Sequence, residues 1–211
     1  MLTKCNLMDN DIEVIPDAIG GMGEELAVLE LRNNKIRVIP SALSALSGLK
    51  VLDVSNNKVE TMEEVTLPNL ADLNLSKNNL CAMPNLSGLR SLARLALSDN
   101  ALTELPASLG TMPSLRTLIL DRNKLRSLPD FGGGCKIASL SVAWNQLVAL
   151  PKSLDGCKDL VELDVTQNKI QGWPRLPQGG KGLTKVALNG NEIPEVTRRS
   201  AGQCDGAPPS P

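Results

Sequence analysis

The sequence predicts a curved α/β solenoid, with a parallel β-sheet on its concave face and short helices, turns and loops on its convex face. Three observations predict this fold. The template L-x-x-L-x-L-x-x-N-x-L-x-x-L-P returns at intervals of 21–24 residues, and all nine copies have Asn at the ninth position. The 211 residues also include 36 Leu but only one Phe, two Trp and no Tyr. Leucine must therefore fill most of a repetitive core.

The repeats predict one domain over residues 1–196, followed by a disordered tail over residues 197–211. The tail region is rich in Gly, Pro and polar residues, which cannot bury a core. The last repeat carries Pro194 early and does not complete the Leu-Pro ending. The repeats start at Leu2, Leu26, Leu49, Leu70, Leu92, Leu115, Ile137, Leu160 and Leu183.

Each repeat is expected to contribute one short strand. Apolar residues at template positions 4 and 6, such as Leu29 and Leu31, point to the same side because strand side chains alternate. One strand cannot bury such a face alone, so successive strands stack in parallel.

The ninth template position forms the predicted structural Asn ladder. A side-chain amide both donates and accepts hydrogen bonds, so stacked Asn residues can satisfy backbone groups in the turn that leaves each strand. The ladder comprises Asn10, Asn34, Asn57, Asn78, Asn100, Asn123, Asn145, Asn168 and Asn191.

Positions 11 and 14 are expected to close the core from the other side, and this places Trp173 in an apolar core position. A Pro follows position 14 in most repeats and fixes φ where the chain turns onto the convex face. The convex segments are too short for more than a turn or two of helix.

The template, its length and its Leu-Pro ending resemble the leucine-rich repeat family over roughly residues 2–196. Within that family the repeats are similar to the typical intracellular class, as in the Ras suppressor and plant intracellular Ras-group proteins. Extracellular members carry Cys-rich caps, and no such cluster is present in this sequence.

Composition argues against catalysis and against nucleic-acid binding. The net charge is −1, the pI is about 5.6 and there is no His. Gly132-Gly-Gly134 lacks the Lys and Ser/Thr of a phosphate-binding loop, and no metal-ligand spacing occurs. We therefore expect no catalytic residue, no cofactor and no metal.

The cysteines and the N-terminal sequence favour a reducing compartment. Cys5, Cys81, Cys135, Cys157 and Cys204 are single and odd in number, so no disulfide framework is expected. Whether Cys135 and Cys157 lie close enough on adjacent coils to interact stays open. No signal peptide or membrane-spanning run is recognisable, and the expected location is cytoplasmic, with a nuclear location as the alternative.

A binding function would use the concave face, where positions 3, 5, 7 and 8 point outward. These positions hold eight acidic and six basic residues, so the face has mixed charge. Trp144 is the one large apolar residue at position 8, and it is the predicted anchor for a protein partner. In the alternative interpretation, Trp144 lies flat over its neighbours and binds nothing. The predicted site comprises Trp144, Arg122, Ile119, Asp121, Arg94, Glu162, Asp164, Glu30, Arg32 and Asp53.

Basic residues follow the Asn ladder along one edge of the solenoid. This basic rim could dock an acidic partner, or it could be a solvated edge that keeps the protein in solution. It comprises Lys35, Lys58, Lys124, Arg126 and Lys169.

The sequence thus predicts a non-catalytic scaffold or adaptor that binds a protein partner in intracellular signalling or complex assembly. The alternative is a regulatory or targeting subunit of an enzyme complex, such as a phosphatase or ubiquitin ligase. The first repeat has no evident cap and could serve for docking or dimerisation. Binding of nucleic acid and insertion into a membrane are not expected.

Overall fold

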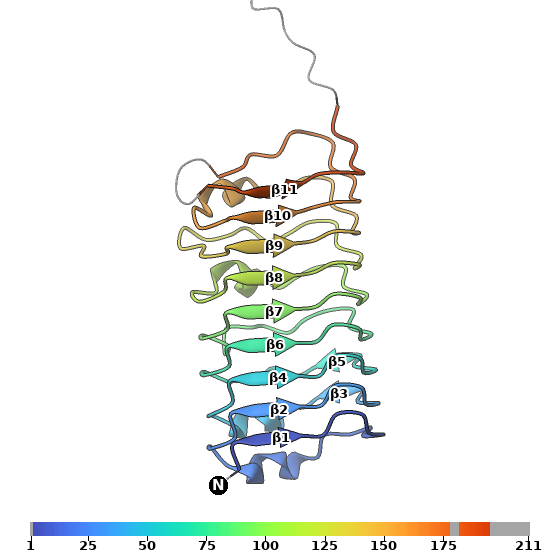
Figure 1. Cartoon of the computed structure of the whole chain (residues 1–211), viewed down its shortest axis with the longest axis vertical. Coiled ribbons are helices and arrows are strands. Elements are labelled where there is room, and N and C mark those ends of the chain that lie inside the picture. Colours follow the sequence, from blue (N-terminus) through green and yellow to red (C-terminus); the bar gives the residue numbers. More distant parts are fainter. Residues whose placement is uncertain (1, 178–181, 195–211) are drawn as a thin grey trace, which may run out of the picture.

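The computed structural model describes residues 2–177 and 182–194. In this part, nine short strands form one sheet in chain order, each parallel to the next (Figure 1). Corresponding template positions pair along the sheet, from Lys4 opposite Val28 to Glu162 opposite Lys185. The predicted parallel solenoid is confirmed. The strands are β1 (Lys4–Asn6), β2 (Val28–Glu30), β4 (Val51–Asp53), β6 (Asp72–Asn74), β7 (Arg94–Ala96), β8 (Thr117–Ile119), β9 (Ser139–Ser141), β10 (Glu162–Asp164) and β11 (Lys185–Ala187).

Short 3-10 helices occupy part of the convex face, as the length of the convex segments requires. Each follows a Pro in extended backbone conformation, which starts the turn away from the core. The helices are η1 (Asp17–Met22), η2 (Ser41–Ala45), η3 (Ala107–Thr111) and η4 (Lys152–Gly156). The tail expected over residues 197–211 lies outside the described residues.

A second small parallel sheet, which the repeat pattern does not predict, joins β3 (Val38–Ile39) to β5 (Thr61–Met62). Directly after β5, Glu63 occupies the place that Pro has in most repeats. Its carboxylate accepts the backbone N–H of Ser41 on the preceding coil at 2.8 Å. Hydrogen bonding by Ser41 lowers the pKa of Glu63.

The core is a continuous stack of Leu, Ile and Val side chains between the sheet and the convex segments. Position 4 and 6 residues such as Leu118 and Leu120 are fully buried. At the first coil Ile15 is buried too, and η1 contributes the buried Ile19. The first repeat, for which the sequence shows no evident cap, therefore contributes buried side chains to the core.

The Asn ladder connects neighbouring coils through backbone groups. Asn123 donates through Nδ2 to the carbonyls of Leu97 at 2.9 Å, Leu120 at 3.0 Å and Asp121 at 3.3 Å. Its Oδ1 accepts the N–H of Leu102 on the preceding coil at 3.0 Å. The other ladder residues from Asn34 to Asn191 likewise accept an N–H from the preceding coil and donate to carbonyls of both coils.

Trp173 is not in the core. Its side chain is 62% exposed, so the prediction of an apolar core position is wrong. The core is incomplete at this end of the stack, where Leu183, Leu188 and Ile193 of the following coil are only partly buried. There is thus no closed interior to receive a large indole.

A disulfide joins Cys135 and Cys157, with the two Cα atoms 5.0 Å apart. The sequence predicts no disulfide framework but leaves the interaction of this pair open, and the structure shows that the two cysteines are bonded. Their separation of 22 residues is one repeat length, which places them on adjacent coils. Cys157 is completely buried, as its apolar position predicts, whereas Cys5 is half-buried and Cys81 exposed, both as free thiols.

Replacing Asn123 by Ala is expected to lower the free energy of unfolding by at least about 3 kcal/mol, because several buried backbone groups lose their partners. Urea unfolding of the purified protein measures this change. Asn10→Ala is the matched control, because Asn10 is exposed and donates only to carbonyls of its own coil. Equal effects of the two substitutions would contradict the role of the ladder in joining coils.

Reduction of the disulfide is expected to lower stability by roughly 3 kcal/mol, the entropic effect of opening a loop of this length. Urea unfolding with and without dithiothreitol measures the difference. The double variant Cys135→Ser/Cys157→Ser should no longer respond to the reductant. A wild-type protein insensitive to reductant would show that the two thiols are not linked.

Candidate functional site

The outward side chains of the sheet form a mixed-charge surface, part of which is neutralised by ion pairs between adjacent strands. Lys4 binds Glu30 at 3.0 Å, and Arg94 binds Asp72 at 3.0 Å. Of the predicted site residues, Glu30 and Arg94 are thus engaged in pairs across strands.

The residue before each ladder Asn has a left-handed backbone conformation. Eight non-Gly residues at template position 8 have φ between 54° and 58°, and Gly190 has φ 68° at the same position of the last repeat. This conformation reverses the chain as it leaves the strand. The non-Gly residues are Asp9, Asn33, Asn56, Lys77, Asp99, Arg122, Trp144 and Gln167.

Trp144 is the residue least suited to this conformation. Asn, Asp and Gly tolerate positive φ, whereas for a bulky side chain it is costly and uncommon. Trp144 nevertheless adopts φ 57° and is 52% exposed. Strained residues of this kind concentrate at functional sites, where the side chain is needed despite its cost.

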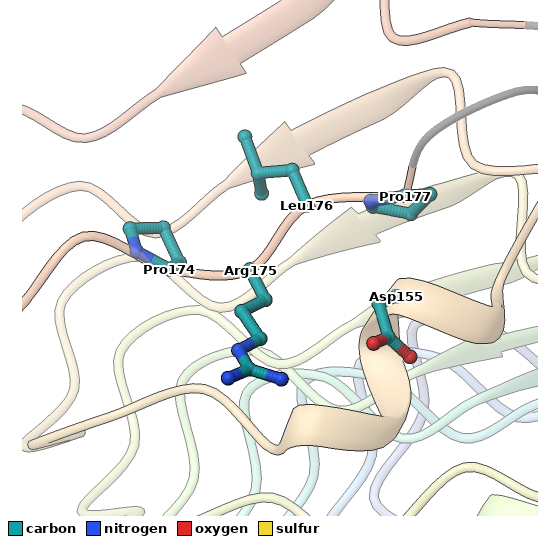
Figure 2. Close-up of a pocket in the computed structure, with 5 residues that line it drawn as sticks. All are labelled: Asp155, Pro174, Arg175, Leu176 and Pro177. Atoms are coloured by element: carbon teal, nitrogen blue, oxygen red, sulfur yellow. The ribbon is translucent and has the colours of Figure 1, made fainter.

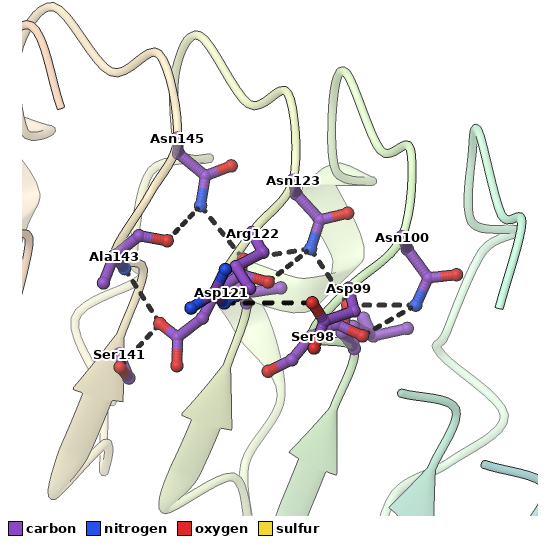
Figure 3. Close-up of polar contacts among 11 residues, drawn as sticks. Ser98, Asp99, Asn100, Asp121, Arg122, Asn123, Ser141, Ala143 and Asn145 are labelled. Carbon is purple, nitrogen blue, oxygen red and sulfur yellow. Dashed lines mark hydrogen bonds and ion pairs between the residues drawn. The ribbon is translucent and has the colours of Figure 1, made fainter. Parts of the chain in front are cut away.

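A row of three side chains on neighbouring coils ends at Trp144. The Arg122 guanidinium lies 5.5 Å from the centroid of the Trp144 ring, a cation–π contact. The Nε of Arg122 also lies 3.9 Å from a carboxylate oxygen of Asp99, and Figure 3 shows this pair across two coils. Arg122 thus covers part of the indole and leaves the rest of it to solvent.

Asp121 supports the end of the neighbouring strand. One of its carboxylate oxygens accepts the hydroxyl of Ser141 at 2.7 Å and the N–H of Ala143 at 2.8 Å (Figure 3). In other repeats an Asp at position 5 caps the corresponding N–H within its own coil, as Asp164 does for Thr166 at 2.9 Å. Asp121 therefore supplies the cap that Ser141 does not provide, and this positions Ala143, the residue before Trp144.

The structure brings part of the predicted site together. Ile119 is half-buried at the end of β8, directly opposite Ser141 of β9. Together with Asp121, Arg122 and Trp144 it forms one patch on two neighbouring coils, which we name the Trp144 patch.

Glu162 and Asp164 lie on β10, one coil beyond Trp144. Within the described part of the chain, neither carboxylate has a cation within ion-pair distance. Arg94 lies one coil before β8. Glu30 lies on β2, Arg32 in the turn after β2, and Asp53 on β4. The predicted residues therefore do not form a single cluster.

All five residues of the basic rim are exposed. Lys35 binds Asp11 at 2.8 Å. This contact, through a hydrogen bond and through charge, lowers the pKa of Asp11 and raises that of Lys35. Lys58, Lys124, Arg126 and Lys169 have no ion pair with described residues, so the basic rim is largely available to solvent.

A cavity of about 670 Å³ lies outside the concave face, between η4 and the segment after Trp173. Figure 2 shows Asp155 on η4 and Arg175 among the residues that line it, with Pro174, Leu176 and Pro177. None of these residues belongs to the predicted site. Among residues 2–177 and 182–194, no cluster of three metal-ligating side chains occurs and no helix is long and apolar enough to cross a bilayer.

Known proteins resemble this chain in sequence and in structure. It is 31% identical over 105 residues to Plant intracellular Ras-group-related LRR protein 8 of Oryza sativa subsp. japonica, a match that covers 50% of this chain and 23% of the relative. It is also 40% identical over 80 residues to the Geranylgeranyl transferase type-2 subunit alpha of Sus scrofa, covering 36% of this chain and 14% of the relative.

A leucine-rich repeat protein of Leptospira interrogans has a similar solved structure. The TM-score is 0.82 at 33% sequence identity, and the match covers 91% of this chain and 50% of that chain. The chain thus spans at most half the length of these three proteins. The sequence profile described as Leucine rich repeat matches residues 1–59, 24–80 and 68–125, which together exceed half of the chain. The chain belongs to the leucine-rich repeat family.

Proposed function

We propose that this protein is a non-catalytic scaffold or adaptor that binds a protein partner on its concave face. The observation that carries the proposal is the exposed Trp144, which is held in a costly left-handed conformation beside Arg122. Trp and Arg are the side chains most enriched among residues that dominate the binding energy of protein interfaces.

The Trp144 patch has the residue composition expected at the centre of a protein–protein interface. Its half-buried Ile119 offers apolar surface, Arg122 offers a cation, and Asp121 holds the adjacent strand end in place. Glu162 and Asp164 on the next coil add negative charge at its border. A partner that inserts an apolar side chain against the indole and places a cation near β10 would complement this surface.

A regulatory or targeting subunit of an enzyme complex is the second candidate. The similarity to the Geranylgeranyl transferase type-2 subunit alpha favours it, since that relative is by name a subunit of an enzyme. In this case catalysis resides on another chain, and the exposed basic rim would dock an acidic surface. Co-purification with an enzymatic activity that is lost at high salt would distinguish this candidate from an adaptor.

The first repeat offers a second surface for docking or dimerisation. Leu2 is 50% exposed, and Cys5, Leu7 and Ile12 are only partly buried.

We place the protein in the cytoplasm on the basis of its similarity to the rice intracellular protein. Disulfides are rare in that compartment, so we expect Cys135 and Cys157 to be thiols there and to pair on oxidation. Differential alkylation in cell extracts tests this.

Replacing Trp144 by Asn is expected to weaken partner binding by more than about 1 kcal/mol, because the anchor is removed. Stability should change by less than about 1 kcal/mol, since relief of the left-handed conformation offsets the lost cation–π contact. Quantitative affinity purification identifies the partner. Titration calorimetry and urea unfolding of both proteins then measure the two effects.

Trp173→Asn is the matched control, because Trp173 is the other exposed indole and lies outside the concave face. Its substitution should leave partner binding unchanged. The proposal fails if the partner binds the Trp144→Asn variant as tightly as the wild type, or if both substitutions weaken binding equally.

A further inference from the structure

The N-terminal half of the concave face contains a small polar pocket on the second, third and fourth repeats. Its volume is about 220 Å³. It lies several coils from the Trp144 patch and includes only one of the residues that the sequence singled out, Arg32. The pocket is lined by Arg32, Ser55, Asn56, Asn74, Ser76 and Lys77.

The cations and hydroxyl groups that line this pocket are not engaged by other described residues. Arg94 and Arg122 on the same face pair with neighbouring carboxylates, at 3.0 Å and 3.9 Å. Within the described part of the chain, in contrast, the Arg32 guanidinium and the Lys77 ammonium form no ion pair. The hydroxyls of Ser55 and Ser76 likewise form no hydrogen bond there. Two cations and two hydroxyl groups therefore line one pocket, and none of them has a partner among the described residues.

The surrounding amides and the nearest carboxylate are held by the sheet itself. Asn74 accepts the N–H of Ser76 at 3.2 Å and donates to Asp53 at 3.3 Å. Asp53 also accepts the N–H of Ser55 at 2.9 Å, and Asn56 donates to Asn33 at 2.7 Å. These bonds hold the floor of the pocket and keep Asp53 out of its lining.

We infer that this pocket binds the phosphate monoester of a phosphorylated Ser or Thr on the protein partner, an inference that rests on the proposed function. Arginine can bind two phosphate oxygens at once, and Lys and hydroxyl groups supply further hydrogen bonds. A phosphate dianion matches the charge of the two cations in the lining, whereas a single carboxylate would neutralise only one of them. The pocket lining has no aromatic side chain on which a nucleotide base could stack.

One extended peptide can reach both this pocket and the Trp144 patch. Lys77 and Trp144 occupy the same template position three repeats apart. Adjacent strands are spaced about 4.8 Å apart, so the two residues are separated by roughly 15 Å across the sheet. About four or five extended residues cover that distance. The partner segment would therefore carry its phosphorylated residue this far from the residue that contacts Trp144.

The test is an NMR titration of the purified protein with the peptide Gly-Gly-pSer-Gly-Gly, with its unphosphorylated form and with inorganic phosphate. The phosphopeptide should perturb the amide signals of Ser55 and Ser76, and the unphosphorylated peptide should not. Arg32→Gln and Lys77→Gln should each weaken phosphopeptide binding about tenfold, since each removes a charge-assisted contact. Asp53→Asn should strengthen it by removing a nearby negative charge.

Lys158→Gln is the matched control, because it removes one exposed cation that lies outside the pocket and the basic rim and has no ion pair among the described residues, and it should change binding less than twofold. The inference is overturned if the phosphopeptide does not bind, if only inorganic phosphate binds, or if Lys158→Gln weakens binding as much as Arg32→Gln. The peptide has no apolar side chain, so its binding should be the same in the Trp144→Asn variant. The phosphate site and the Trp144 anchor can therefore fail independently.

Discussion

The hydrogen bonds of the Asn ladder are the interaction on which the whole structure depends. Each three-residue strand is too short to be stable by itself, and the chain must reverse within the interior after every strand. That reversal would bury backbone groups without partners. A side-chain amide at the ninth position satisfies them, and it does so on two coils at once, as Asn123 does for Leu120 and Leu97. The same hydrogen bonds therefore hold neighbouring coils together and provide partners for the backbone groups of the turn.

The ladder also accounts for the surface on which we place binding. Because the turn must reverse before each Asn, the preceding residue adopts a left-handed conformation and its side chain joins a row across the sheet. Along this row, Asn56 contacts Asn33, Arg122 contacts Asp99, and Arg122 covers part of Trp144. A structural requirement of the backbone thus creates a line of adjacent side chains that can vary without loss of the fold.

The two halves of the concave face differ in chemistry. Arg32 and Lys77, which have no ion pair among the described residues, line the pocket of the N-terminal half in which we place a phosphate. The C-terminal half combines an exposed indole with carboxylates on β10 that have no cation partner among the described residues. A partner segment with a phosphate at one end and an apolar residue followed by a cation at the other would match both halves. Binding would then depend on modification of the partner.

The sequence by itself determined the solenoid, its nine parallel strands and the identity of the Asn ladder, because the template reports the buried positions of every coil. It could also have indicated the left-handed row, since Asp, Asn or Gly occupies template position 8 in five of the nine repeats. Only the tertiary structure decided which outward residues meet. The Cys135–Cys157 disulfide, the role of Asp121 as a cap for Ala143 and the exposure of Trp173 depend on contacts between coils. The pocket between Arg32 and Lys77 likewise depends on how diagonal neighbours pack, which a pattern within one repeat does not encode.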